Sequence, residues 1–297
     1  MKLRDLQYFC SLYKTGTFTE LAKSFKVEQP TVTLAIKRLE NELGETLVLR
    51  NRSKGIIEVT QVGEILYHHA QNILHEENLA STEIKHFNKG IRFGLPPIIG
   101  NLYFPLVAKK IAEDGLMANL ELDETGSNQL YQDLMAGKID IALLGSSLPI
   151  RNKKLTTNFL SSGEFVIISS KKHWLAKQNT VSFEDLKQEP FVTLNGKFIH
   201  DHVLNLYSQR VNFSPKIIFE TQSIETLKNL VAQDVGIALL VKDAILPTDN
   251  LAVNYLQSPL PEKFNVSIAT RKDYIRDNLE KKFIEDLEVL KNKIHQA

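Results

Sequence analysis

The sequence has a single cysteine, a single tryptophan and no long uninterrupted hydrophobic run. One cysteine excludes an internal disulfide framework. No segment has enough consecutive apolar residues to span a membrane, and no apolar run of the kind found in a secretory signal precedes the first amphipathic segment. We therefore expect a cytoplasmic protein.

A large excess of charge of either sign is also absent. The formal net charge is +1 over 297 residues, and the hydrophobic content of 43% leaves room for two or three compact units. The sequence lacks a nucleophile elbow, a phosphate-binding loop and metal-ligand spacing. We therefore expect no enzyme activity, no cofactor and no metal.

Three short amphipathic helices are predicted in the first 45 residues. Apolar residues recur at three- and four-residue steps over residues 3–13. Thr17 or Thr19 can cap a second helix. Pro30 can stand in the first turn of a third helix, where its missing N–H is tolerated, and Gly44 can end that helix.

The third helix is predicted to enter the major groove of DNA. We expect it to bury Val32, Ile36, Leu39 and Leu43. Its early polar side chains can then meet base edges, and its later basic side chains can meet phosphates. The residues that we expect to contact DNA from this helix are Gln29, Thr31, Thr33, Lys37 and Arg38.

A basic hairpin is predicted after the third helix, with strands at about residues 47–49 and 56–59. Its tip contains Arg50, Arg52 and Lys54, which we expect to lie in or near the minor groove. Short amphipathic helices also occur in proteins that do not bind DNA, however. Residues 1–60 hold ten Lys and Arg against seven Asp and Glu, a modest excess for a nucleic-acid binder.

A longer pattern resembles the LysR-type transcriptional regulators, and the resemblance extends through the whole chain. The residues that carry it are the run from Gln29 to Glu40, Leu43-Gly44, Leu47, Arg50 and Thr60-Gln61-Val62-Gly63. The family usually has serine where Thr33 stands, often arginine where Leu34 stands and usually phenylalanine where Val48 stands. Thr33 keeps the hydroxyl, whereas Leu34 removes an expected DNA contact.

The resemblance implies three parts. Residues 1–61 would form a winged helix-turn-helix, residues 62–89 a linker helix for dimerisation, and residues 90–297 an α/β effector-binding domain. That domain would have two lobes, like periplasmic solute-binding proteins, with lobe I at 90–161 and 266–297 and lobe II at 162–265. The linker helix would hold a homodimer or homotetramer through Leu66, Ile73 and Leu74, since its apolar stripe is too long to be buried against the small N-terminal domain.

Strand and helix patterns alternate after residue 90, which indicates parallel α/β layering. Strands are predicted at residues 91–95, 120–124, 139–144, 164–169, 191–194, 216–220, 237–241 and 266–270. Residues 96–101 are predicted to be a loop that leads into a helix, and residues 279–294 a final helix. Asp234 stands where relatives usually have glycine, so we expect a differently shaped turn there.

Ligands of open α/β sheets bind at the carboxyl ends of strands, beside helix N-termini. By resemblance, the residues that would line an effector cleft are Pro97, Gly100, Asn101, Ser127, Asn128, Thr193 and Lys197. Ser127 could equally serve only to cap its helix. Lys197 and His200, each taken alone, are expected to be exposed on the surface.

The resemblance implies a ligand-responsive transcription factor that binds promoter DNA, a small-molecule effector and RNA polymerase. Residues 94–101 resemble the malolactic-type members, which implies a small dicarboxylic acid such as malate. A transport-type solute receptor would share the two-lobed fold, but it would need a secretion signal and would lack the DNA-binding motif. A redox-sensing member would need cysteines in the effector domain, whereas Cys10 lies in the first helix.

Overall fold

The computed structural model describes residues 1–51, 56–196 and 198–294, with the side chains of residues 50 and 51 left out. The chain divides into two compact units, Met1–Lys85 and His86–Ala297. Within the described residues, no helix combines the length and apolar character that a membrane span requires.

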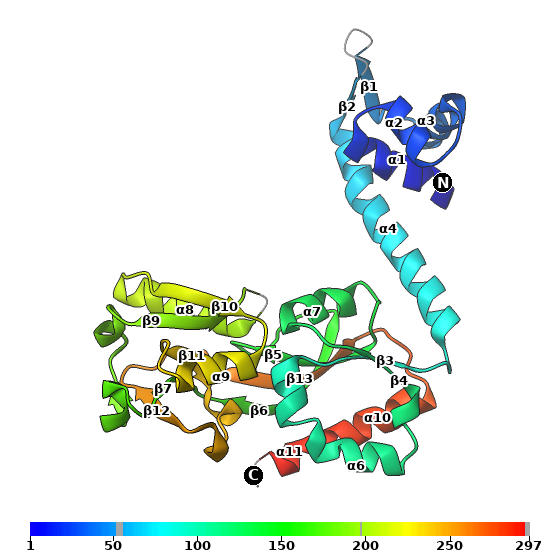
Figure 1. Ribbon diagram of the computed structural model, residues 1–297. Coiled ribbons are helices and arrows are strands. Elements are labelled where there is room, and N and C mark those ends of the chain that lie inside the picture. The colour runs from blue at the N-terminus through cyan, green and yellow to red at the C-terminus, as the bar shows by residue number, and fades with distance from the viewer. Residues whose placement is uncertain (52–55, 197, 295–297) are drawn as a thin grey trace. The chain divides into compact units, whose positions relative to one another are not determined.

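Unit 1 begins with three helices that confirm the predicted helix-turn-helix (Figure 1). They are α1 Leu3–Thr15, α2 Phe18–Ser24 and α3 Gln29–Leu43. Gly16 and Gly44 end α1 and α3 in the left-handed conformation, at φ values of 72° and 71°. The backbone N–H of Glu20 donates to the Thr17 hydroxyl at 3.2 Å, so Thr17 caps α2.

The three helices share one hydrophobic core. Its fully buried members include Phe9, Leu12, Leu21, Val32, Ile36, Leu39 and Leu47. Leu43 was expected to be buried but is 40% exposed. It lies in the last turn of α3, and Leu47 takes the buried position after the chain turns at Gly44.

A two-stranded wing and a long helix complete unit 1. They are β1 Val48–Asn51, β2 Ile56–Val59 and α4 Gln61–His86. The N–H of Gly63 donates to the Thr60 hydroxyl at 3.0 Å, which caps the start of α4. A Cβ atom on Gly63 would lie 2.4 Å from the carbonyl oxygen of Leu47. Only glycine therefore allows α4 to start this close to the wing.

Unit 2 is built on two sheets, each the centre of one lobe. The sheet of lobe I has the order β4-β3-β5-β13-β6, in which β3 is parallel to β4 and β5, and β13 is antiparallel to β5 and β6. Its strands are β3 Ile91–Gly94, β4 Leu120–Asp123, β5 Ile141–Ser146, β6 Leu155–Gly163 and β13 Phe264–Arg271. The parallel arrangement predicted for the first three strands is confirmed.

The sheet of lobe II has the order β11-β7-β12-β8, and the parallel pair β10-β9 joins it through a bridge between Phe191 and Ile237. Its strands are β7 Phe165–Ser170, β8 Thr180–Val181, β9 Pro190–Leu194, β10 Lys216–Thr221, β11 Ala238–Val241 and β12 Leu251–Leu256. The chain crosses between the lobes where β6 runs into β7 and again before β13.

Helices cover both sheets. Lobe I carries α5 Pro97–Leu102, α6 Pro105–Glu113, α7 Ser127–Met135, α10 Asn278–Glu288 and α11 Leu290–Lys293. Lobe II carries α8 Ile199–Val211 and α9 Ile224–Ala232. Short 3-10 turns lie at Met117–Asn119, Trp174–Lys177, Phe183–Leu186, Lys242–Ala244 and Pro247–Asp249.

Two local predictions in unit 2 were wrong. The segment expected to be a loop before a helix is itself helical, because Pro97 stands in the first turn of α5, where a helix tolerates proline. The single helix expected at residues 279–294 is divided into α10 and α11 at Val289. Asp234, at φ 63°, takes the left-handed conformation that a glycine would have supplied.

A buried ionic cluster joins strands β3 and β13 of lobe I to the residue directly before β5. The Asp140 carboxylate accepts two hydrogen bonds of 2.7 Å from the Arg92 guanidinium and one of 2.8 Å from Arg271. Asp140 is 1% exposed and each arginine 7%. The arginines also donate at 2.8 Å to the backbone carbonyls of Leu134, Gly137 and Ile139. The cluster therefore fixes the turn between α7 and β5.

Asp140→Asn should destabilise unit 2 by about 3–5 kcal/mol, because two buried guanidinium groups would lose their shared counter-charge. Urea unfolding followed by the fluorescence of Trp174, the single tryptophan, reports on this unit. As a control, Glu113→Gln removes a carboxylate from an exposed pair with Lys109 and should leave the midpoint nearly unchanged. An Asp140→Asn midpoint equal to that of wild type would contradict the structural role of the cluster.

Candidate functional site

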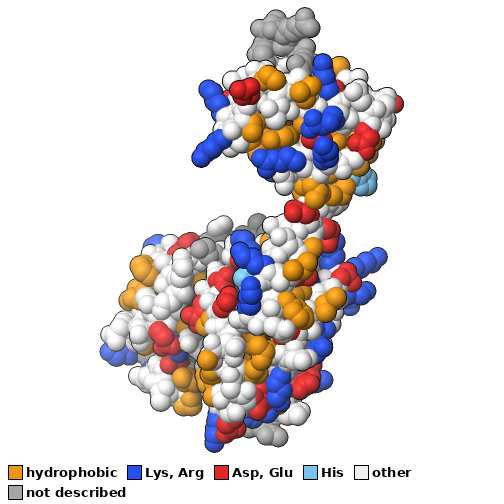
Figure 2. Space-filling view, turned by 90° about the vertical axis from the view of Figure 1, so that its right-hand side faces the viewer, with side chains coloured by type: hydrophobic (Ala, Val, Ile, Leu, Met, Phe, Trp, Pro, Cys, Tyr) orange, Lys and Arg blue, Asp and Glu red, His pale blue; other side chains and the backbone are white. Residues whose placement is uncertain are grey.

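The outer face of α3 carries most of the side chains predicted to contact DNA. Gln29, Thr31 and Lys37 are exposed and Thr33 is half-buried. The opposite face is fully buried and consists of Val32, Ala35, Ile36 and Leu39. The polar side chains of the helix that are predicted to contact DNA thus lie apart from its apolar face. In Figure 2 the visible face of unit 1 carries basic side chains interspersed with hydrophobic ones.

Arg38 has a structural partner that the sequence did not predict. Its Nη2 and Nε donate to the two carboxylate oxygens of Asp5 on α1, at 2.6 and 3.1 Å. Asp5 is buried, whereas half of the Arg38 side chain stays exposed. Arg38 therefore ties α3 to α1, and its outer part remains accessible.

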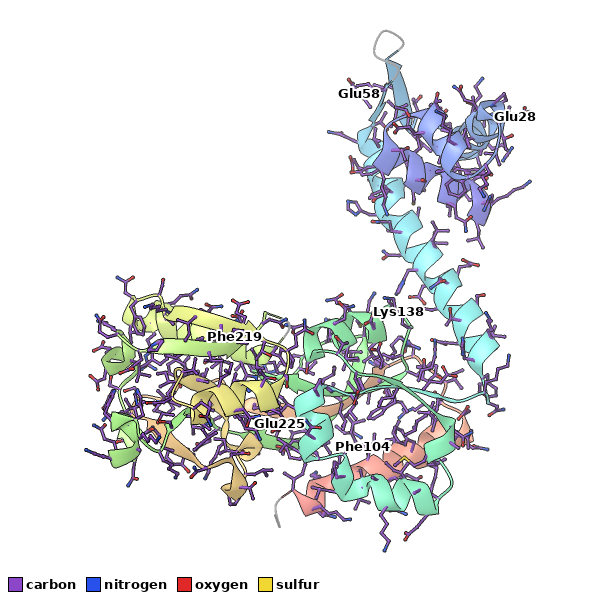
Figure 3. The ribbon with its side chains drawn as sticks, viewed as in Figure 1. Glu28, Glu58, Phe104, Lys138, Phe219 and Glu225 are labelled. Atoms are coloured by element: carbon purple, nitrogen blue, oxygen red, sulfur yellow. The ribbon has the colours of Figure 1, made fainter. Side chains whose placement is uncertain are left out.

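Glu40 also holds the recognition helix in place. One carboxylate oxygen of Glu40 accepts the backbone N–H groups of Leu47 and Val48, at 3.0 and 3.4 Å. These two bonds fix the start of the wing relative to α3. Figure 3 labels Glu28, directly before α3, and Glu58 on β2, which mark these two elements. The side chain of Arg50, together with Arg52 and Lys54, lies outside the described residues.

Ser127 and Asn128 form the first turn of α7 and line a cavity in unit 2. The N-cap of this helix is Gly126, so Ser127 is not a cap. The Ser127 hydroxyl instead accepts the backbone N–H of Gly145 at 2.9 Å, which ties the helix start to the end of β5. The N–H groups of Ser127 and Asn128 belong to the helix turn that has no intrahelical acceptors for them. They are suited to hold an anion.

The cavity has a volume of about 170 Å³ and lies between the two lobes. Lobe I lines it with Ser127, Asn128, Tyr131, Leu144, Gly145, Ser146, Ser147 and Ile150, and lobe II with Ile199 and His202. Among the described lining residues, His202 is the one that can carry a positive charge. The start of α7 in lobe I therefore shares one cavity with the start of α8 in lobe II.

Four other predicted effector residues have different surroundings. Asn101 is exposed near the end of α5, and the N–H of Gly100 is already bonded to the Pro96 carbonyl at 2.8 Å. Thr193 is buried and donates to the carbonyl of Leu194. These residues and Pro97 are not among those that line the cavity of Ser127. Lys197 lies outside the described residues.

His200 was expected to be exposed, and this expectation was wrong. It is 1% exposed and sits between the rings of Phe165 and Phe264, at centroid distances of 5.4 and 5.7 Å. Burial lowers its pKa to about 3, so the ring is neutral. Its Nε2 accepts the backbone N–H of Val241 at 3.3 Å. His200 is thus part of the packing where the two lobes meet.

One polar contact joins the lobes beside this packing, and a second ties together the two segments that cross between them. The Tyr103 hydroxyl, directly after α5, donates to the Asp243 carboxylate of lobe II at 2.8 Å. Burial, together with the neighbouring Asp243 charge, raises the pKa of Tyr103 well above its ordinary value, so the hydroxyl remains a donor. Lys263 and Glu164, one on each crossing segment, form an ion pair at 2.9 Å.

Family models match most of the chain. The LysR substrate binding domain matches residues 86–290, and the model for the bacterial regulatory helix-turn-helix protein of the lysR family matches residues 3–64. The chain belongs to the LysR family of transcriptional regulators. It thus has a DNA-binding and an effector-binding domain.

Relatives and solved structures agree with this membership. The malolactic fermentation system transcriptional activator of Lactococcus lactis is 34% identical, over 98% of this chain and 99% of the relative. A full-length OxyR variant from Pseudomonas aeruginosa has a TM-score of 0.56 at 24% identity, over 98% of this chain and 99% of the other. The effector-binding domain of QuiR in complex with shikimate has a TM-score of 0.59 at 18% identity, over 69% of this chain and 97% of that chain.

In this LysR-family protein, the sequence reasoning missed most of the cavity lining. Ser146 ends the buried strand β5 and Ser147 follows it, so the same strand-end rule that pointed to Ser127 could have found them. His202 occupies the first turn of α8, four residues after the helix N-cap Phe198. His202 is far in sequence from the lobe I residues, so the sequence did not predict that they would share a cavity.

Proposed function

We propose that α3 reads a promoter sequence in the major groove and that the protein responds to a small effector. The observation that carries the DNA part is the outer face of α3, where Gln29, Thr31 and Lys37 are exposed and every buried side chain points the other way. Thr33 and the outer part of Arg38 complete this face. Arg50, Arg52 and Lys54 of the wing are proposed to contact the backbone or the minor groove.

We further propose that the effector is a small organic acid bound in the cavity between the lobes. The N–H groups at the start of α7 favour an anion, and His202 can add a positive charge. A cavity of about 150 Å³ holds a molecule of the size of benzene, and the cavity here has about 170 Å³. A four-carbon dicarboxylic acid such as malate is close to that size, and the malolactic relative supports this choice.

The protein is proposed to act as a homodimer or homotetramer in the cytoplasm, by binding rather than by catalysis, with RNA polymerase as a further partner. The predicted interface of α4 needs revision in one respect. Leu66 is buried in the core of unit 1, and Leu74 packs against that core. The large apolar side chains that α4 leaves exposed are Ile65, Ile73 and Ile84, at 61%, 39% and 79%. They are the better candidates for contact with a second copy.

Lys37→Ala should weaken binding to all duplexes and reduce the slope of log affinity against log salt concentration by about one, as expected for one lost phosphate contact. Gel-shift titrations at several salt concentrations measure both. Lys85→Ala is the matched control, because it removes the same charge from an exposed position at the far end of α4. An unchanged affinity and slope for Lys37→Ala would remove Lys37 from the interface.

Ile65→Glu combined with Ile73→Glu should lower the mass found by sedimentation velocity and weaken operator binding, because two linked half-sites bind more tightly than one. Ile275→Glu places one such charge at an exposed isoleucine of unit 2 and serves as the control. A doubly charged variant that keeps the wild-type mass would place the main interface elsewhere.

A thermal-shift screen of organic acids should find one that stabilises the protein by mass action. With that acid, Ser127→Ala should cost about 1–3 kcal/mol of binding free energy in calorimetry, the usual effect of a lost buried hydrogen-bond partner. Because Ser127 also holds Gly145, the midpoint of the ligand-free variant is measured as well. Asn101→Ala should bind nearly as wild type does, and a loss equal to that of Ser127→Ala would restore Asn101 to the site.

A further inference from the structure

Leu34 is an exposed leucine in the middle of the helix proposed to read DNA. It is the sixth residue of α3 and is 56% exposed, although the same helix buries four apolar residues on its inner face. An exposed large side chain is not unusual by itself. Its position among the residues predicted to contact DNA requires an explanation.

Leu34 lies on the outermost line of α3. Residues three or four apart are neighbours on a helix surface, so Pro30, Leu34, Lys37 and Asn41 form one row. All four are exposed, and the buried residues lie on the opposite side. When α3 enters a groove with this row leading, Leu34 points at the groove floor, one turn before Lys37.

The major-groove floor has one apolar feature that a leucine can recognise. Of the four bases, only thymine presents a methyl group there, and the other edges present hydrogen-bond donors or acceptors. A leucine side chain forms no hydrogen bond. Against a cytosine amino group it would displace a water molecule and leave the amino group without that hydrogen-bond partner. Against a thymine methyl, the contact removes apolar surface of both partners from water.

We propose that Leu34 is a specificity-determining residue that reads the 5-methyl group of a thymine in each half-site. This rests on the proposed function of α3 in the major groove. The neighbours of Leu34 support DNA over a protein as the occupant of this face. Thr31 and Thr33 offer hydroxyl groups, and Lys37 supplies a positive charge one turn further along the helix. A protein-binding surface would rather expose a larger apolar patch.

The test uses the full-length protein and a duplex selected by it from a library with a random core of about two helical turns, enough for two half-sites. Each thymine of the selected duplex is then replaced in turn by deoxyuridine, which removes only the methyl group. At one symmetry-related pair of positions, affinity should fall about fourfold for each half-site, the factor expected for one buried methyl-sized group. The Leu34→Ala variant should have equal affinity for duplexes with thymine and with deoxyuridine at these positions.

Leu43→Ala is the matched control, because it shortens another partly exposed leucine of α3 that lies off the outer row. It should keep the full discrimination between thymine and deoxyuridine. Equal discrimination in wild type and Leu34→Ala, or none in wild type, would overturn the proposal while leaving DNA binding by α3 intact. If the wild-type protein selects no duplex and Lys37→Ala leaves the DNA affinity unchanged, the proposed function itself would be overturned.

Discussion

The Asp140 carboxylate joins two arginines that enter lobe I from opposite ends of the effector domain's sequence. Arg92 comes from β3 and Arg271 from the end of β13, after the chain has passed through lobe II and returned. The pairing of β13 with β5 brings the returning segment back, and the ion pairs hold its end. An uncompensated charge at this depth would be costly, so the three groups depend on one another.

The position of the cavity follows from this anchored strand. Asp140 directly precedes β5, and the far end of β5 carries Gly145, whose N–H holds the Ser127 hydroxyl. A Cβ atom on Gly145 would lie 2.9 Å from Ile199 of lobe II and 3.2 Å from the ring of Phe264. Glycine therefore allows the lobes to approach at this point. The neutral ring of His200 fills the adjoining space without bringing a charge into it.

Local signals in the sequence predicted local structure well. Helix starts and ends depend on residues within one turn, such as Gly16, Gly44, Thr17 and Pro30. The ends of α1, α2 and α3 are where these residues predicted them. Contacts between distant segments were not predictable in the same way. Nothing in the sequence near Arg38 indicates that Asp5 will be its partner. For the cavity, the strand-end rule found Ser127 and Asn128, but only the folded chain brings the start of α8 against them.

The charge available to the DNA-binding unit limits how it can recognise its target. Residues 1–60 carry a small excess of basic side chains, and one of these, Arg38, is held by the buried Asp5. Attraction to phosphates is independent of sequence and scales with the number of contacts. A unit with only a small excess of basic side chains gains less from this term, so contacts with base edges supply a larger share of its affinity. An apolar side chain on the outer row of α3 is consistent with this larger share of base contacts, because a contact with a methyl group discriminates between bases without adding charge.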